Sequence, residues 1–176
     1  MSDGNRNATP GPEDTAPVTV EAYTLAMRRV VSPVAVITAA AGTDRNGMTA
    51  TAICSATTDP PTLLACINTE ARALRLIEQT GRFAVSFLSE EQSDIARAFS
   101  TRGLAGETRL KLGRWTTLVT GAPVLDGAVG AFDCEVTATY PCGAHLILLG
   151  RVVGVADSED SALLYRDGFF RRVAPE

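Results

Sequence analysis

Hydrophobic residues along this chain fall into short runs with the spacing of β-strands. Three continuous apolar runs are typical of strands buried on both faces. These runs are residues 34–40, 62–68 and 82–88. From Phe132 to Tyr140 apolar and polar residues alternate, which predicts a strand whose polar face, Asp133 included, is exposed to water. The segment "PCGA" then turns the chain, and residues 145–155 predict a returning strand that is buried on both faces over its first half.

Helix signals occur in three places. Thr19 predicts the N-cap of a helix that ends before Pro33. Residues 71–80 place apolar side chains on one helical face, and Gly81 predicts the end of that helix. Ser89 starts a capping-box pattern ahead of a short helix with an apolar face. That face is formed by Ile95, Ala98 and Phe99.

The order of these elements predicts the fold class. Strands follow one another through short turns with only two helical insertions, so the protein is predicted to be mainly β, an antiparallel sheet that closes as a small barrel, with a few short helices. Polar segments at residues 42–47 and 100–113 predict a turn and a long loop. Residues 1–17 predict a disordered tail, and residues 18–176 predict a single domain.

Composition and charge exclude several classes of function. The 176 residues carry a net charge of −4, so no overall positive charge is present to hold nucleic acid or an anionic membrane surface. We see no signal peptide and no apolar stretch long enough to span a membrane, which predicts a cytoplasmic protein. Four cysteines without a CxxC pair and a single histidine predict reduced core thiols and no metal site. These cysteines are Cys54, Cys66, Cys134 and Cys142.

The segment "NGMTATAICSATTDPP", residues 46–61, is rich in small residues and offers two interpretations. Residues 42–49, "GTDRNGMT", resemble a phosphate loop, but Met48 replaces the essential lysine and no helix follows. The second interpretation is a thin wall beside a planar ring, built from alanines that leave room and hydroxyls that offer polar contacts. A tightly packed strand crossing needs small residues for the same steric reason, so spacing alone leaves that alternative open.

Five segments, taken in chain order, resemble those of a known protein family, and the resemblance covers most of the chain. They are "GMTATAICSATTDPP", "LLACIN", "GRFAVSFLSEEQSDIARAFS", "PVLDGAVGAFDCEV" and "LILLGRVVGV". Together they resemble the short-chain flavin reductases, the reductase components of two-component flavin-dependent monooxygenases. The segment "YPCGAHLILLG" is similar to actinobacterial antibiotic-pathway members of that family. The resemblance implies a homodimeric flavin-binding split barrel that uses NADH to reduce FAD or FMN and supplies reduced flavin to a partner monooxygenase.

The resemblance also implies site residues. For the flavin they are Ser32, Pro33, Val34, Thr49, Ala50, Thr51, Ala52, Ser55, Ala56, Thr57, Asn68, Ala71, Arg72, Ala73 and Phe99. For NADH they are His145, which would orient the donor, with Phe170 and Arg171. Two hydroxyls of the family's phosphate-binding motif are replaced by Ala71 and Ala73, so FAD becomes a candidate beside FMN. A non-catalytic flavin- or haem-binding split-barrel protein, or a structural partner subunit, is the alternative.

Overall fold

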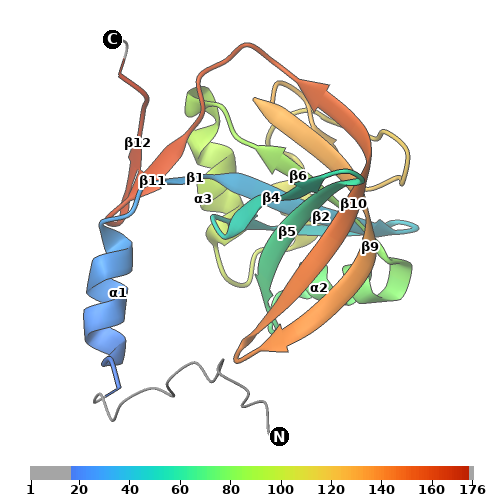
Figure 1. Ribbon diagram of the computed structural model, residues 1–176. Coiled ribbons are helices and arrows are strands. Elements are labelled where there is room, and N and C mark those ends of the chain that lie inside the picture. Colours follow the sequence, from blue (N-terminus) through green and yellow to red (C-terminus); the bar gives the residue numbers. More distant parts are fainter. Residues whose placement is uncertain (1–16, 175–176) are drawn as a thin grey trace, which may run out of the picture.

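One antiparallel sheet of seven strands forms the centre of the protein (Figure 1). A computed structural model describes residues 17–174, so the predicted tail lies almost wholly outside the described residues. The strands are β2 (Ala35–Ala41), β3 (Asp44–Ala50), β4 (Ile53–Thr58), β5 (Pro61–Asn68), β6 (Arg82–Phe87), β9 (Gly130–Cys142) and β10 (His145–Asp157). They lie in the order β3-β2-β6-β9-β10-β5-β4, and every neighbouring pair is antiparallel. The prediction of a mainly antiparallel β protein is confirmed.

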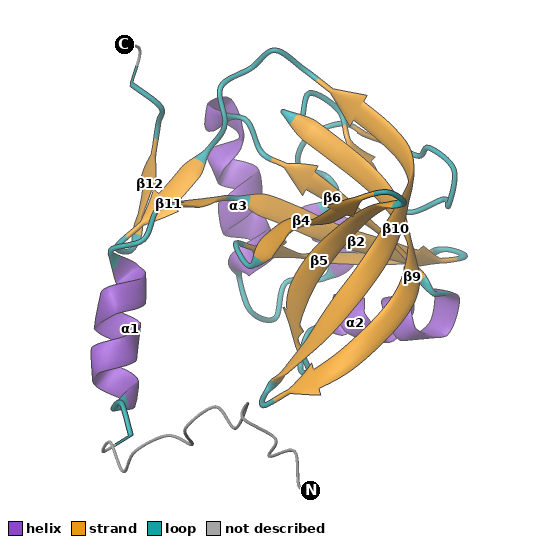
Figure 2. Cartoon of the chain, in the orientation of Figure 1, coloured by secondary structure: helices purple, strands orange, loops and turns teal. Residues whose placement is uncertain are grey.

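The sheet curls strongly, because its two outer strands follow each other in the chain (Figure 2). Only Thr51 and Ala52 join β3 to β4, and three Cα–Cα steps span at most about 11 Å. The edges of a flat sheet of seven strands would lie roughly 29 Å apart. The carbonyl oxygen of Ala52 also accepts a hydrogen bond from the amide of Cys66 on β5 at 2.9 Å, so the joining segment is held close to the opposite edge.

Helices and short strands surround the sheet. The helices are α1 (Val20–Arg28), α2 (Arg72–Thr80), α3 (Ser93–Ser100) and α4 (Gly106–Arg109), with a 3₁₀ turn η1 (Glu90–Gln92) before α3. The short strands are β1 (Ser32–Pro33), β7 (Trp115–Thr116), β8 (Val124–Leu125), β11 (Leu164–Arg166) and β12 (Phe169–Arg171). β1, β11 and β12 form a small sheet, and β7 pairs with β8.

The predicted helix ends are confirmed. The Thr19 hydroxyl accepts a hydrogen bond from the amide of Ala22 at 3.2 Å, and Gly81 ends α2 in the left-handed conformation with φ of 67°. The amide of Ser89 donates to the side chain of Gln92 at 3.0 Å, but this cap belongs to η1 and α3 follows it. Local hydrogen bonds and the left-handed backbone at Gly81 therefore position these boundaries.

Two apolar clusters cover the two faces of the sheet. Alternate residues of β2 enter different clusters: Ala35 and Ile37 pack with α2, whereas Val36 packs with α3. This division explains why β2 reads as a continuous apolar run. β2 therefore lies between the two helices and packs against both.

Two loop predictions are wrong in extent. Residues Asp44–Gly47 were predicted as part of a turn, yet they belong to β3 and pair with β2, so the turn is only Gly42 and Thr43. Antiparallel pairing of these polar residues with Ala39 and Ala40 outweighs their low strand preference. The predicted loop at 100–113 also contains the short helix α4.

The prediction of core thiols holds for Cys134 alone. Cys134 is buried, and its burial raises the pKa of the thiol to about 12. Cys66 is half-buried, and burial first, then the negative charges that Cys142 and Cys54 would carry, raise its pKa. Cys54 and Cys142 are exposed, which corrects the interpretation of Cys54: it lies on β4, an outer strand of the sheet.

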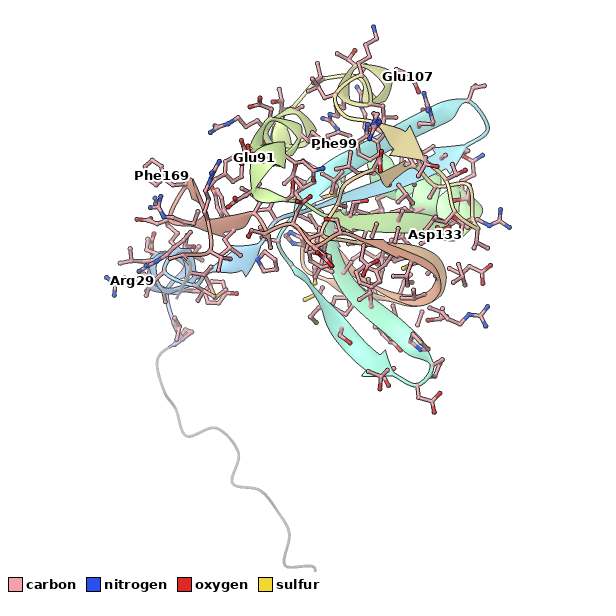
Figure 3. The ribbon with its side chains drawn as sticks, turned by 90° about the horizontal axis from the view of Figure 1, so that it is seen from above. Arg29, Glu91, Phe99, Glu107, Asp133 and Phe169 are labelled. Carbon is pink, nitrogen blue, oxygen red and sulfur yellow. The ribbon has the colours of Figure 1, made fainter. Side chains whose placement is uncertain are left out.

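Two predictions about the β9–β10 hairpin are also corrected. Asp133 was predicted to face water but is fully buried (Figure 3). The first half of β10 was predicted to be buried on both faces, but only Leu148 and Gly150 are buried there, while His145 is exposed. The other apolar residues of that half are partly exposed. These are Leu146, Ile147 and Leu149.

Candidate active site

A polar cavity of about 370 Å³ lies where β3, the start of α2 and the segment after α3 meet. Its lining residues are Gly47, Met48, Thr49, Asn68, Glu70, Ala71, Arg72, residues 100–104 and Arg109. Three of them are arginines and one is a glutamate, so the cavity carries net positive charge. Residues 42–49 thus do contribute to a basic cavity, although through strand β3 and without the geometry of a phosphate loop.

An apolar cavity of about 220 Å³ adjoins the polar one. It is lined by Val34, Thr49, Ala50, Thr51, Ala96, Ser100, Tyr165 and Phe170. Thr49 and Ser100 line both cavities, so the two spaces meet at these residues. An apolar space that opens into a basic one fits a planar organic group joined to an anionic tail.

The backbone of β3 is held close to the helix that covers it. A Cβ atom added at Gly47 would lie 2.6 Å from the ring of Phe99 and 2.8 Å from the carbonyl oxygen of Ile37. The Thr49 hydroxyl donates to the carbonyl oxygen of Ala96 on α3 at 2.7 Å. Small residues at this end of β3 therefore serve a tight strand–helix packing as well as the cavity wall, and both interpretations of the small-residue segment apply.

Arg109 is the most constrained charged side chain at the site. It is 9% exposed, and its terminal nitrogens donate to Asn46 Oδ1 at 3.2 Å, Gly47 O at 2.6 Å and Thr101 O at 2.6 Å. Its Nε is buried without a hydrogen-bond partner within the described residues. Burial first, and then the positive charge of Arg72, lower the pKa of Arg109. A buried guanidinium that meets only neutral acceptors favours an anionic ligand in the cavity it lines.

Two further arginines face the same cavity. Neither Arg72 nor Arg102 forms an ion pair among residues 17–174. Arg72 is the first residue of α2, and no side chain caps this helix at Ala71, so the helix N-terminus adds to the positive potential. The residues present therefore fit a phosphate group, even though the hydroxyls expected at Ala71 and Ala73 are missing.

The segment that carries Arg109 is fixed to β3. Arg45 on β3 forms a two-point ion pair with Glu107 of α4, with N–O distances of 3.0 and 2.7 Å. Gly106 lies so close to the carbonyl oxygen of Arg45 that a Cβ atom there would overlap it. Figure 3 shows Glu107 on this helix at the edge of the molecule. These contacts fix α4, and with it Arg109, against β3.

The other end of the site is aromatic. The rings of Tyr165 and Phe170 meet edge to face with centroids 5.8 Å apart, and the guanidinium of Arg97 lies 5.0 Å from the centroid of Phe170. Phe170 also lines a separate cavity of about 350 Å³ that contains Arg171 and Arg172. Phe170 thus forms a wall between the apolar cavity and a second basic surface.

His145 lies at the tip of the β9–β10 hairpin. It is exposed and lines none of the cavities described above, but it is paired with Asn68, which lines the polar cavity. The structure does not bring His145 together with Phe170 and Arg171, which line cavities formed by β12 and α3. A role for His145 toward NADH stays a prediction.

The remaining predicted residues divide into three groups. Val34, Thr49, Ala50, Thr51, Asn68, Ala71 and Arg72 line the two cavities. Ala73 and Phe99 are buried in the core, where their side chains pack against protein, and the ring centroids of Phe99 and Trp115 are 5.3 Å apart. Ser32, Pro33, Ala52, Ser55, Ala56 and Thr57 line neither cavity. Contact of this last group with a flavin stays a prediction.

Several cavity residues were missed at the level of sequence. They are Glu70, Ala96, Ser100, Thr101, Arg102, Gly103, Leu104, Arg109 and Tyr165. The two arginines lie in "TRGLAGETRL", a segment whose glycines and lack of period predicted only a loop. The sequence signal that could have indicated these residues was a pair of arginines in a Gly-rich loop after a helix. Only the fold shows that one of them is buried beside β3.

Residues 27–174 match the family described as "Flavin reductase like domain". The chain belongs to this family. Over 153 residues it is 40% identical to a protein of Stutzerimonas stutzeri named FMN reductase (NADH) RutF, covering 86% of this chain and 87% of that protein.

Solved structures of flavin reductases share the fold. An NADH:FAD oxidoreductase of Streptomyces globisporus, in complex with NAD and FAD fragments, superposes with a TM-score of 0.83 at 28% identity, covering 94% of this chain and 99% of that chain. BorF, the flavin reductase component of a bacterial two-component tryptophan halogenase, gives a TM-score of 0.81 at 27% identity, covering 90% of this chain and 100% of that chain.

No helix in residues 17–174 has the length and apolar character needed to cross a membrane. Within the same residues, no three His, Cys, Asp or Glu side chains lie together as a possible metal site.

Proposed function

We propose that this protein is an NADH-dependent flavin reductase that takes FMN or FAD as a substrate. The observation that carries the proposal is the apolar cavity that opens into the basic one at Thr49 and Ser100. An isoalloxazine ring fits the first cavity and a flavin phosphate fits the second. Family membership and the NADH-dependent relative support the same conclusion.

The protein's own contribution is binding and orientation. Hydride transfer from NADH to flavin is supplied by the two nucleotides and requires no acid, base or nucleophile from the chain. Arg72, Arg102 and Arg109 would hold the phosphate, while Ala50 and Phe170 would confine the ring. Exclusion of water and a fixed ring position leave the nicotinamide one face on which to stack.

The test of the proposal is NADH oxidation by the purified protein in the presence of FMN, FAD or riboflavin. Turnover that depends on flavin is the expected result. If none of the three flavins supports NADH oxidation while the protein still binds flavin, the chain is a non-catalytic flavin carrier and the proposal fails.

His145 is proposed to orient the nicotinamide of NADH. Replacing it with alanine is expected to raise the KM for NADH about fivefold, the equivalent of about 1 kcal/mol for one hydrogen bond, and to leave the KM for flavin unchanged. Steady-state kinetics with each substrate varied in turn measures both constants. Replacement of Thr139, an exposed residue of the same hairpin, with alanine is the matched control. An equal change in both KM values, or none, would show that His145 has no role specific to NADH.

A homodimer and a partner monooxygenase are part of the proposal. α1 has no buried residue and exposes Tyr23, Leu25 and Met27, and Figure 1 shows it beside the β11–β12 hairpin, away from the sheet. Exposed apolar surface of this kind is typical of a subunit contact. Delivery of reduced flavin to a monooxygenase is supported by the likeness to the flavin reductase of a styrene monooxygenase. A split barrel, a cytoplasmic location and a role in secondary metabolism rest on the sequence alone.

A further inference from the structure

A further cavity of about 250 Å³ lies beside Arg72. Its lining residues are Asp44, Asn46, Arg72, Arg75 and Leu76. Arg72 lines both this cavity and the polar one. Asn46 of this cavity accepts a hydrogen bond from Arg109 of the polar cavity, so the two cavities adjoin at Arg72 and at this hydrogen bond. A ligand that reaches Arg72 from the flavin side therefore arrives at the mouth of a second space.

The lining contains two arginines and one aspartate, so this cavity carries net positive charge. Arg72 and Arg75 are three residues apart on α2, which places them as neighbours on one helical face. Both are exposed, and neither has an ion-pair partner in the part of the chain that the structure describes. Arg45, close by on β3, is in contrast paired with Glu107. Two free guanidinium groups side by side match two adjacent phosphate groups.

The remaining lining residues suit a nucleoside. The carboxylate of Asp44 can accept hydrogen bonds from ribose hydroxyls or an adenine amino group, and Leu76 offers apolar contact to a base. FMN would end at its single phosphate and leave Arg75 and Asp44 without a ligand. We propose that this cavity binds the adenosine monophosphate half of FAD, with its phosphate between Arg72 and Arg75, and that FAD is the preferred flavin. This inference rests on the proposed function.

NADH carries the same adenosine diphosphate chemistry and is the other possible source of the group. We assign the cavity to FAD because it shares Arg72 with the space proposed for the flavin phosphate. The arginines near Phe170, by contrast, line a cavity that does not include Arg72. Measurements in which only FAD or only NADH is varied distinguish these two sources.

The test compares FAD with FMN in the wild type and in Arg75→Gln. The wild type is expected to bind FAD at least tenfold more tightly than FMN, as measured by quenching of flavin fluorescence without NADH. Arg75→Gln is expected to weaken FAD binding about tenfold and to leave FMN binding unchanged. Arg82→Gln is the matched control, because Arg82 is equally exposed but lines none of the cavities, and it should change neither affinity.

Two further arms identify the source of the adenosine group. AMP alone should displace FAD from the wild type, and it should do so less effectively from Arg75→Gln. The KM for NADH, measured with FMN as acceptor, should be the same in both proteins. Equal affinities of the wild type for FAD and FMN, or a higher KM for NADH in Arg75→Gln, would overturn the assignment. Failure of the proposed function would look different, since neither flavin would then support NADH oxidation.

Discussion

Replacing Arg109 with methionine is expected to weaken FMN binding roughly 100-fold, because a buried charge–phosphate interaction is worth about 3 kcal/mol. Methionine keeps much of the volume of the side chain but removes the charge and the three hydrogen bonds to Asn46, Gly47 and Thr101. Riboflavin has no phosphate, so its affinity should fall less than tenfold. Titration of flavin fluorescence measures both affinities.

The control for Arg109 is Arg45, which contacts α4, the helix that contains Arg109. Arg45→Gln removes the exposed ion pair with Glu107, which is worth about 0–1 kcal/mol, and FMN affinity should change by less than about fivefold. Thermal unfolding of both variants shows whether the fold is retained. If Arg109→Met weakened riboflavin and FMN equally, Arg109 would only position the loop and would not provide the phosphate site.

Asp133→Ala is expected to lower the free energy of unfolding by about 3 kcal/mol, the result of removing hydrogen bonds to a buried charge. The Asp133 carboxylate accepts hydrogen bonds from the amides of Val119 and Thr120, both at 2.7 Å, and from the Thr120 hydroxyl. These bonds fix the segment between β7 and β8 to the centre of the sheet. Urea unfolding followed by circular dichroism measures the difference.

Glu135→Ala is the matched control for this prediction. Glu135 lies two residues further along β9, and its carboxylate forms an exposed ion pair with Arg151 at 2.7 Å. Its removal should cost less than about 1 kcal/mol. If Asp133→Ala lowered the free energy of unfolding by as little, the buried carboxylate would not anchor the segment between β7 and β8.

Local chemistry explains which elements the sequence could predict. Thr19, Gly81 and the apolar run of β2 each act through near neighbours, so the helix ends and the strands were predictable from the sequence. Asp133 was mispredicted because alternation alone assigns every polar residue to water. Its partners, Val119 and Thr120, approach from a separate segment, and only the folded chain brings them together.

The candidate site shows the same limit. The wall residues Thr49, Ala50 and Thr51 were predictable, because small side chains in a strand are visible in the sequence. Arg109 was not predictable, because its burial depends on Gly106 packing against Arg45 of β3. The resemblance also implied a flavin contact for Phe99, whose ring is buried close to Gly47. That contact stays a prediction.

The central claim, that the joined cavities hold a flavin for reduction by NADH, is tested most directly by mixing the protein with FMN and NADH without oxygen. The yellow absorbance of oxidised flavin should disappear at a rate proportional to protein concentration, with one NADH consumed per flavin. Reduction of the flavin no faster than in a mixture without the protein would contradict the account.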